Sequence, residues 1–549
     1  MAREKQSGGL GRKGVLLGAL SVAAMAMAAP AFADEAACKA LSGRVLPRES
    51  ITLPVSSAKL TSAEFIAAAG PLPAYCKVLG EMGPIDPKAH AILFQVNLPE
   101  TWNEKAVQYG GNGMNGTVVN ALGALRDQKP ATPVPLAQGY VTLGTDSGHP
   151  NTTPDAQTFM LNEEELTNYA YASYKKTYDA ARAVMGLRYG KMPKRFYYYG
   201  GSEGGREAMS GAQRYPRDYD GIVAAVPLVH FTGLFMDNQR YFNLSQEGGW
   251  MTADKLQLVQ QQALDTCDEL DGAKDGIVSQ YVGCHAKLNT TALRCPDGRE
   301  GAGCLSDAQV ALVTAIRTPN DLGFPLANGR TRTGGPLPVG AENKPGSINQ
   351  WFMAQNRPPA DDLGRAHLGP GVVRFLIAQD PEFRGRLDTA KYRARIQQVS
   401  RLLDMSNPDL SAFAARGGKL IMKENTGDYV VSAYGVFDYY DAVTRRMGAA
   451  RTAQFSRMYV TPGGNHGGSV PTIDNTPVAD KVDFLEVLDN WVEKGTAPGD
   501  LMATSYTTGA NPQEVATRPI CRYPTYPHFN GGDWKKGENF ACRPLPGRR

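Results

Sequence analysis

The stretch Phe196-Tyr197-Tyr198-Tyr199-Gly200-Gly201-Ser202-Glu203-Gly204-Gly205-Arg206 runs from an aromatic, strand-like segment into G-x-S-x-G, and a helix-like segment follows. In that setting the serine would lie on a sharp strand-to-helix turn with its hydroxyl exposed above a sheet. The glycines two residues before and after it let neighbouring backbones pass closely. Because 60 of the 549 residues are glycine, the pentapeptide alone is weak evidence, and the flanking strand and helix carry the prediction. We predict that Ser202 is a catalytic nucleophile.

Residues 1–33 have the pattern of a secretory signal peptide. A basic start precedes a short apolar run over residues 15–29, and Ala31-Phe32-Ala33 offers a small-x-small cleavage site. No later segment is long and apolar enough to suggest a membrane span. We expect cleavage after Ala33 and a soluble protein, secreted or periplasmic.

Charge and cysteine content limit the class of protein. Removing the signal peptide removes four basic residues and one acidic residue, so the formal net charge falls from +4 to +1. That balance gives no support to a nucleic-acid or membrane partner. All eight cysteines lie in the mature part, and an even number in an exported chain favours disulfides. The simplest connectivity pairs sequence neighbours, although eight cysteines allow 105 pairings. They are Cys38, Cys76, Cys267, Cys284, Cys295, Cys304, Cys521 and Cys542.

Short apolar runs separated by turn residues and helical patterns indicate an α/β protein with a mostly parallel sheet. Strand-like runs occur at 91–96, 106–109 and 140–144, and a helical pattern covers about 166–185. After residue 228 the chain becomes rich in Gly, Pro, Asn and Gln, and strand-like runs resume only at 418–422 and 456–460. We therefore predict a core over 34–228 and 406–549, with a lid inserted over 229–405.

A serine nucleophile needs a histidine to take its proton and a carboxylate to orient that histidine. In α/β-hydrolases these residues follow the serine in the order acid, then histidine. His466 lies in the loop Pro462-Gly463-Gly464-Asn465-His466-Gly467-Gly468, directly after the last strand candidate. We predict His466 as the base, because His528 lies in a proline-flanked tail where a surface role fits better.

Asp428 is the predicted acid. It follows the strand at 418–422, and loops at the carboxyl ends of parallel strands are where sites gather in open α/β sheets. Glu424 is a possible rival for this role. Asp438 and Asp441 lie on an apparent helix, where solvated charges are the ordinary interpretation.

The oxyanion of a tetrahedral intermediate needs backbone N–H donors. One is expected from Glu203, the residue after the nucleophile, and another from a glycine loop after an early strand. The loop Gly110-Gly111-Asn112-Gly113-Met114-Asn115-Gly116 fits that position.

An acidic loop lies within the predicted lid. Asp268, Asp271 and Asp275 occur within eight residues with glycines between them, so they could surround a hard cation. The spacing differs from an EF-hand loop, and a solvated acidic turn explains the spacing equally well.

Five spaced motifs together resemble the tannase and feruloyl esterase family, and the resemblance covers nearly the whole mature chain. They are residues 200–207, 110–116, 145–149, 267–278 and 463–466. The resemblance implies an α/β-hydrolase core with helices on both faces of its mostly parallel sheet, and a lid that covers the acyl group.

The resemblance also implies roles for particular residues. It implies the triad Ser202, Asp428 and His466, and an oxyanion hole made by the N–H groups of Gly113 and Glu203. It implies a structural Ca²⁺ held by the side chains of Asp268, Asp271 and Asp275 and the carbonyls of Ala273 and Ile277. The disulfides that it implies are Cys38–Cys76, Cys267–Cys284, Cys295–Cys304 and Cys521–Cys542.

The chain departs from the family beside the triad. Relatives usually have a cysteine directly before the serine and another directly after the histidine, bridged to each other, whereas this chain has Gly201 and Gly467. Without that disulfide we expect the mutual geometry of the serine and histidine loops to rest on packing alone.

These observations predict a secreted serine carboxylesterase that hydrolyses small esters of aromatic acids, of the feruloyl, galloyl or benzoyl kind, through an acyl-enzyme. A hydrolase of the terephthalate monoester MHET would also fit. Arg365 or Arg374 would then pair with the substrate carboxylate, although solvated surface arginines are the more ordinary interpretation. The same motifs are compatible with a serine peptidase or acyltransferase, and with a binding protein on a degenerate hydrolase scaffold. No pattern in the sequence indicates the oligomeric state.

Overall fold

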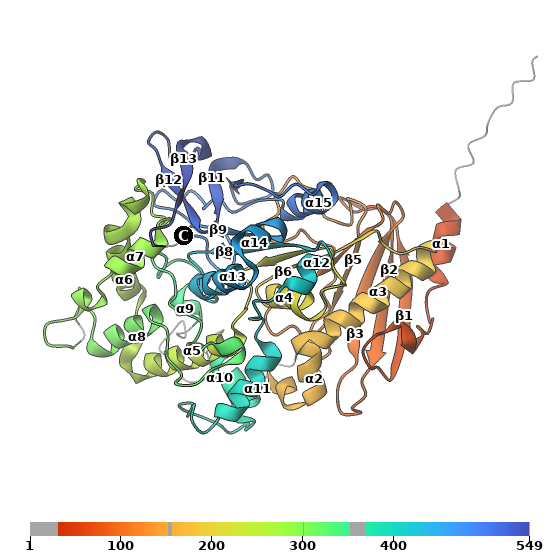
Figure 1. Ribbon diagram of the computed structural model, residues 1–549, viewed down its shortest axis with the longest axis horizontal. Helices are drawn as coiled ribbons and strands as arrows, with labels where there is room; N and C mark the ends of the chain where they lie inside the picture. The colour runs from red at the N-terminus through yellow and green to blue at the C-terminus, as the bar shows by residue number, and fades with distance from the viewer. Residues whose placement is uncertain (1–30, 152–155, 300, 352–367, 548–549) are drawn as a thin grey trace, which may run out of the picture.

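The computed structural model describes residues 31–151, 156–299, 301–351 and 368–547 (Figure 1). An eleven-stranded sheet forms its centre, in the order β1-β2-β3-β5-β4-β6-β7-β8-β9-β11-β10. The strands from β5 to β9 pair in parallel, and those at both ends pair antiparallel, so the predicted parallel sheet is the middle of a larger mixed sheet. The strands are β1 (Ser57–Ile66), β2 (Tyr75–Gly83), β3 (Ile92–Pro99), β4 (Lys105–Tyr109), β5 (Val141–Thr145), β6 (Arg195–Gly201), β7 (Gly221–Ala225), β8 (Lys419–Asn425), β9 (Ser456–Thr461), β10 (Leu501–Tyr506) and β11 (Glu514–Arg522).

The aromatic run of β6 shows how the sheet is covered on both faces. Successive side chains of a strand point to opposite faces. Phe196 and Tyr198 join the cluster that holds helices α3 and α4, whereas Tyr197 and Tyr199 join the cluster under helix α15. An uninterrupted aromatic run therefore fits a central strand that is buried on both sides. The helices that pack on the core sheet are α3 (Ser173–Tyr189), α4 (Glu203–Arg214), α13 (Ala433–Met447), α14 (Ala449–Phe455) and α15 (Phe484–Lys494).

The insertion between β7 and β8 is helical. Figure 1 shows its helices α6, α7 and α8 in green, beyond the carboxyl ends of the parallel strands. The insertion packs directly on the core: the Ser432 hydroxyl donates to the Pro336 carbonyl at 2.6 Å, and His230 Nε2 lies 3.1 Å from the Gly435 carbonyl. The domain boundaries at 228 and 405 stay a prediction. The helices are α5 (Phe231–Leu244), α6 (Ala253–Cys267), α7 (Tyr281–Lys287), α8 (Asp307–Arg317), α9 (Ile348–Trp351), α10 (Leu368–Val372), α11 (Arg393–Leu403) and α12 (Ser411–Ala415).

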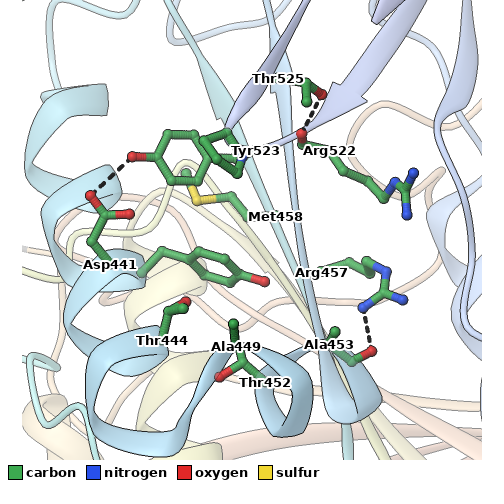
Figure 2. Close-up of a pocket in the computed structure, with 12 residues that line it drawn as sticks. Asp441, Thr444, Ala449, Thr452, Ala453, Arg457, Met458, Arg522, Tyr523 and Thr525 are labelled. Carbon is green, nitrogen blue, oxygen red and sulfur yellow. Dashed lines mark hydrogen bonds between the residues drawn. The ribbon is translucent and has the colours of Figure 1, made fainter. Parts of the chain in front are cut away.

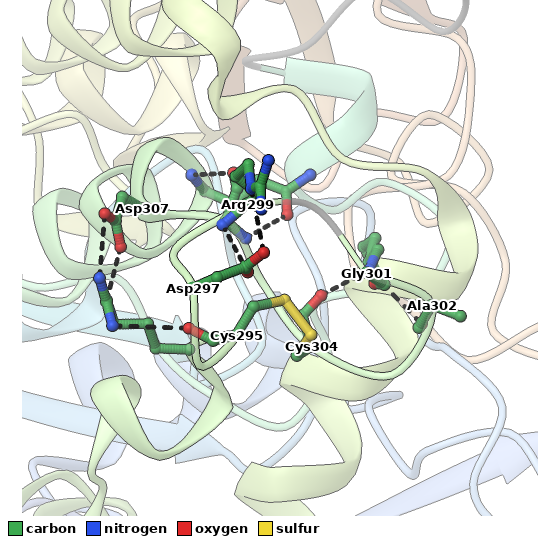
Figure 3. Close-up of a disulfide and its surroundings, with 11 residues drawn as sticks. Cys295, Asp297, Arg299, Gly301, Ala302, Cys304 and Asp307 are labelled. Carbon is green, nitrogen blue, oxygen red and sulfur yellow. Dashed lines mark hydrogen bonds and ion pairs between the residues drawn. A yellow bond between two sulfur atoms is a disulfide. The ribbon is translucent and has the colours of Figure 1, made fainter.

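All eight cysteines are paired, and the four implied disulfides are confirmed. Cys521–Cys542 ties β11 to the terminal hairpin of β12 (Thr525–Phe529) and β13 (Phe540–Pro544). Figure 3 shows Cys295–Cys304 closing a short lid loop, beside the ion pair of Asp297 with Arg299.

Residues 1–30 of the predicted signal peptide lie outside the described residues, and Ala31–Ala33 form the start of helix α1 (Ala31–Lys39). Within the described part of the chain, no helix combines the length and the apolarity that a membrane crossing requires.

Candidate active site

Ser202 occupies the turn between β6 and α4. Its backbone has φ 60° and ψ −120°, a conformation that costs free energy for a residue with a side chain and that is typical of a nucleophile elbow. The flanking glycines are required by space. A methyl group on Gly200 would stand 2.1 Å from the Gly204 carbonyl oxygen, and one on Gly204 would stand 2.8 Å from the Gly111 oxygen.

The structure brings the three predicted triad residues together. Ser202 Oγ lies 2.8 Å from His466 Nε2, and His466 Nδ1 lies 2.8 Å from Asp428 Oδ2. Asp428 follows β8 and is fully buried, and its Oδ1 accepts from the N–H groups of Val430 and Val431 at 2.7 and 3.0 Å. These donors fix the carboxylate, so that Nδ1–H can donate to it while Nε2 accepts the serine proton.

The rival acids and the second histidine lie in different settings. Glu424 is buried within β8, where burial and the charge of Asp428 raise its pKa well above its ordinary value. Asp438 lies on α13, 3.7 Å from Arg330, and Asp441 on the same helix accepts from the Tyr523 hydroxyl. His528 lies in β12, beside Tyr526.

The predicted oxyanion loop lies against the start of α4. Gly204 N–H donates to the Gly111 carbonyl at 3.0 Å, which joins the loop to the helix. Around Gly113 the loop is open, since a methyl group there would meet nothing within 4 Å. The roles of the Gly113 and Glu203 N–H groups stay a prediction.

A buried carboxylate on α4 holds this loop in place. Glu207 accepts from Gly111 N–H at 3.0 Å, from Asn115 Nδ2 at 2.6 Å and from the Tyr198 hydroxyl at 2.8 Å. Burial, together with the charge of Glu203, raises the pKa of Glu207 to about 7. The sequence motifs gave no role to Glu207, although its place one turn after the nucleophile was a usable signal.

The lid reaches the histidine loop. Asn465 Nδ2 donates to the Pro345 carbonyl at 2.6 Å, and the Trp351 ring stands edge-on to the His466 imidazole, 5.6 Å between centroids. Trp351 was not foreseen, because nothing in the local sequence of a Gly- and Pro-rich insertion indicates which of its residues meets a loop that lies more than a hundred residues later.

The acidic lid loop is buried, so the interpretation as a solvated acidic turn is wrong. Asp268, Asp271 and Asp275 are 4%, 0% and 0% exposed, and Ala273 and Ile277 are buried beside them. Asp275 Oδ2 pairs with Arg518. Asp268 and Asp271 accept from backbone N–H groups, and Asp271 Oδ2 has no hydrogen-bond partner within the described residues.

The charge and burial of this loop suit a cation, but its carboxylate groups, as they stand, do not lie close enough together to form a binding site. Across the described ranges, no three Asp, Glu, His or Cys side chains gather as a ready-made metal cluster. A buried carboxylate oxygen without a partner is costly, and a hard cation would supply one.

Two further features lie outside the triad. A cavity of about 370 Å³ opens between α13, α14 and β11, lined among others by Tyr440, Arg457, Arg522 and Tyr523 (Figure 2), and none of its lining residues belongs to the predicted site. Arg365 lies outside the described residues. The half-buried Arg374 is in the lid, with its guanidinium 5.5 Å from the Phe375 ring centre.

Comparisons with known proteins give one answer. A family model described as "Tannase and feruloyl esterase" matches residues 76–543. The chain is 34% identical over 527 residues to an uncharacterized esterase of Agrobacterium fabrum, covering 92% of both chains. It is 32% identical over 575 residues to the mono(2-hydroxyethyl) terephthalate hydrolase of Piscinibacter sakaiensis, covering 94% of this chain and 93% of that one.

A solved structure shows the same fold. The crystal structure of feruloyl esterase B from Aspergillus oryzae matches with a TM-score of 0.75 at 20% identity, covering 93% of this chain and 100% of that one. The chain therefore belongs to the tannase and feruloyl esterase family of carboxylic ester hydrolases, with an α/β-hydrolase fold.

Proposed function

We propose that this esterase is exported and hydrolyses small esters of aromatic acids, of the feruloyl, galloyl or benzoyl kind, through an acyl-enzyme on Ser202. The observation that carries the mechanism is the unbroken chain of hydrogen-bond contacts from Asp428 through His466 to the Ser202 hydroxyl, with 2.8 Å at both steps.

Each proton in this reaction passes through His466 Nε2. That nitrogen takes the Ser202 proton as the serine oxygen attacks the ester carbonyl carbon, and returns it to the alcohol oxygen as the C–O bond breaks. It then deprotonates the water that attacks the acyl-enzyme, and Ser202 regains a proton as the acid leaves. Asp428 holds Nδ1–H and stabilises the imidazolium, while the N–H groups of Gly113 and Glu203 would stabilise the oxyanion.

Support for an aromatic acyl group comes from the site and from the relatives. Trp351 brings an indole ring to the edge of the His466 imidazole, where a flat acyl group would pack well. The relatives include proteins named as a probable feruloyl esterase and as a terephthalate monoester hydrolase. Because one relative is named as a terephthalate monoester hydrolase, MHET is a specific candidate substrate beside ferulate and gallate esters.

A substrate panel with a nucleophile variant tests this function. Purified enzyme should hydrolyse at least one of methyl ferulate, methyl gallate and MHET, and Ser202→Ala should lower kcat by about 10⁴-fold or more. Ser469→Ala, a change in an exposed serine of the histidine loop, should leave kcat within about twofold. Full activity in Ser202→Ala would refute the assignment. Peptide cleavage without ester preference would favour a peptidase, and failure of every substrate would favour a binding protein.

Export is supported by the four disulfides and by the pattern of residues 1–33. Sequencing the amino terminus of protein recovered from the periplasm or medium should give Asp34 as the first residue. A cytoplasmic protein that begins at Met1 would overturn this part of the proposal.

The acidic lid loop is proposed to hold a structural Ca²⁺. The side chains of Asp268, Asp271 and Asp275 and the carbonyls of Ala273 and Ile277 would bind it, and its charge would balance carboxylates that Arg518 alone does not neutralise. No step of the reaction depends on it, and its expected contribution is to the stability of the lid.

A further inference from the structure

Arg126 lies between the two loops that carry the serine and the histidine. It belongs to the long connection from β4 to β5 and is half-buried. Its Nη2 donates to the backbone carbonyl of His466. Its side chain also passes so close to Gly201 that a methyl group there would stand 2.5 Å from Arg126 Cδ and 3.0 Å from Nη1. One side chain thus contacts the residue before the nucleophile and the backbone of the base.

The glycine at 201 is what makes this contact possible. Gly201 ends strand β6 without the positive φ that only glycine adopts readily, and the space that a side chain there would need is taken by the Arg126 side chain. The Arg126 side chain packs against the serine side at Gly201 and adds one hydrogen bond on the histidine side, so the link between the two loops consists of packing together with that bond.

Arg126 is itself held by the sheet and by the segment before α15. Its backbone carbonyl accepts from the Tyr199 hydroxyl of β6 at 2.6 Å. The next residue, Asp127, pairs with Lys423 of β8 at 3.0 Å, and both side chains are at most 1% exposed. The Asp127 carbonyl also accepts from Val482 N–H at 2.8 Å. These contacts fix the backbone from which the arginine side chain reaches the two loops.

The surrounding charges keep Asp127 ionised. Burial opposes the charged form of Asp127, but the charges of Lys423 and Arg126 outweigh it and lower the pKa of that carboxyl. Variants that change only the Arg126 side chain remove one of these charges but leave Lys423 paired with Asp127, so the ion pair is expected to remain.

We propose that Arg126 is a positioning residue that sets the distance between the Ser202 hydroxyl and the His466 imidazole by joining the nucleophile strand to the histidine loop. The inference rests on the proposed triad. A displacement of about 1 Å in a catalytic group can lower a rate by about 10²-fold, so loss of this contact should appear in kcat rather than in substrate binding.

Replacing the Arg126 guanidinium tests its hydrogen bond to the His466 carbonyl. Arg126→Met keeps most of the aliphatic stem and loses the donor. We expect kcat for the best ester of the panel, and the rate of Ser202 labelling by a fluorophosphonate, to fall about 10- to 100-fold while KM stays within about twofold. Arg126→Lys keeps a hydrogen-bond donor but replaces the guanidinium by an ammonium group. Its kcat and labelling rate should lie between those of Arg126→Met and wild type. Arg457→Met is the matched control, because Arg457 also donates to backbone carbonyls, at a site lined by other residues (Figure 2), and it should leave both rates unchanged.

A second set of variants tests the contact without relying on an Arg126 variant that folds. Gly201→Ala would push the arginine aside and should slow labelling by a similar factor. In the Arg126→Ala background, Gly201→Ala should slow labelling by less than about a further twofold, because the arginine side chain no longer occupies the space beside residue 201.

The outcomes separate this inference from the proposed function. Wild-type rates in Arg126→Met, or losses in Arg126→Ala and Gly201→Ala that simply multiply in the double variant, would overturn the positioning role. Wild-type enzyme that hydrolyses esters without any labelling of Ser202 would instead overturn the triad on which it rests.

Discussion

The carboxyl end of the central sheet and the acidic loop of the lid both bury carboxylates, but different partners neutralise them. At the sheet, Asp428 accepts from two backbone N–H groups and contacts His466, and Glu207 accepts from three donors. In the lid, Asp271 keeps one oxygen without a partner among the described residues, and Arg518 pairs with Asp275.

On our proposal, the lid loop binds a cation from solution, whereas the triad is assembled by protein groups alone. Buried carboxylates are tolerated when hydrogen bonds or opposite charges satisfy them. The sheet end supplies these to Asp428 from its own residues, although Glu203 Oε2 and Glu424 Oε1 there also lack a hydrogen-bond partner among the described residues. Three carboxylates are buried in the lid loop, where Arg518 pairs with Asp275, and the proposed divalent cation would add further positive charge there.

The largest expected effect comes from breaking the sheet end. Asp428→Asn keeps the shape of the side chain but removes the charge that holds Nδ1–H, so kcat should fall by about 10⁴-fold with the fold intact. Asp438→Asn, on the neighbouring helix α13, should leave kcat within about twofold. A small effect at Asp428 would mean that another group orients His466.

Removing the cation should have the next largest effect, and it should act on stability. Calcium at about 100 times its Kd would stabilise the folded chain by about 2.7 kcal/mol. A chelator should therefore lower Tm by about 2 to 3 °C, and added CaCl₂ should restore it. Asp271→Asn should show a lower Tm in calcium and a smaller response to the chelator. An unchanged Tm on chelation would contradict the calcium proposal.

The smallest effect is expected from the ionisation of Glu207. Burial raises the pKa of this carboxyl more than its hydrogen bonds lower it. Its pKa is raised to about 7 from an ordinary value of 4.5. Between pH 4.5 and about pH 7, the folded state therefore keeps a proton that the unfolded state has released. Stability from this group is therefore present at low pH and lost as pH rises through about 7.

A comparison of Tm values measures this loss. The Tm of Glu207→Gln relative to wild type should rise by about 2 °C or more between pH 5 and pH 8, because glutamine does not ionise. Glu49→Gln, at an exposed position, should show no such trend. A difference that stays constant with pH would mean that Glu207 is fully stabilised as a carboxylate.

Local patterns foretold the parts of the site that lie next to their own signals. Ser202 follows from a strand, glycines and a helix within one segment, and His466 and Asp428 follow from loops after strands, which parallel pairing brings to one edge of the sheet. The residues alone suggested sequential disulfides and a possible cation loop with Asp268, Asp271 and Asp275, and the resemblance supplied the full disulfide set and the proposed calcium ligands.

The contacts between distant segments could not be foretold in this way. Arg126 meets His466 across 340 residues of sequence, and Trp351 reaches the same imidazole from the lid. The antiparallel strands β1, β2, β10 and β11 were also missed, although β1, β2 and β11 are nine or ten residues long; strand preference depends on which neighbours a strand packs against. Such features depend on tertiary packing, which a single sequence does not display.

The most direct test of the proposed mechanism is covalent labelling of the nucleophile. Wild-type enzyme treated with a fluorophosphonate should gain one adduct per chain, and peptide mapping by mass spectrometry should place it on Ser202. The same treatment of His466→Ala should give little or no adduct in the same time, since the hydroxyl then has no base. An adduct on another residue, or ester hydrolysis by enzyme that gains no adduct, would contradict the assignment of Ser202 as the nucleophile.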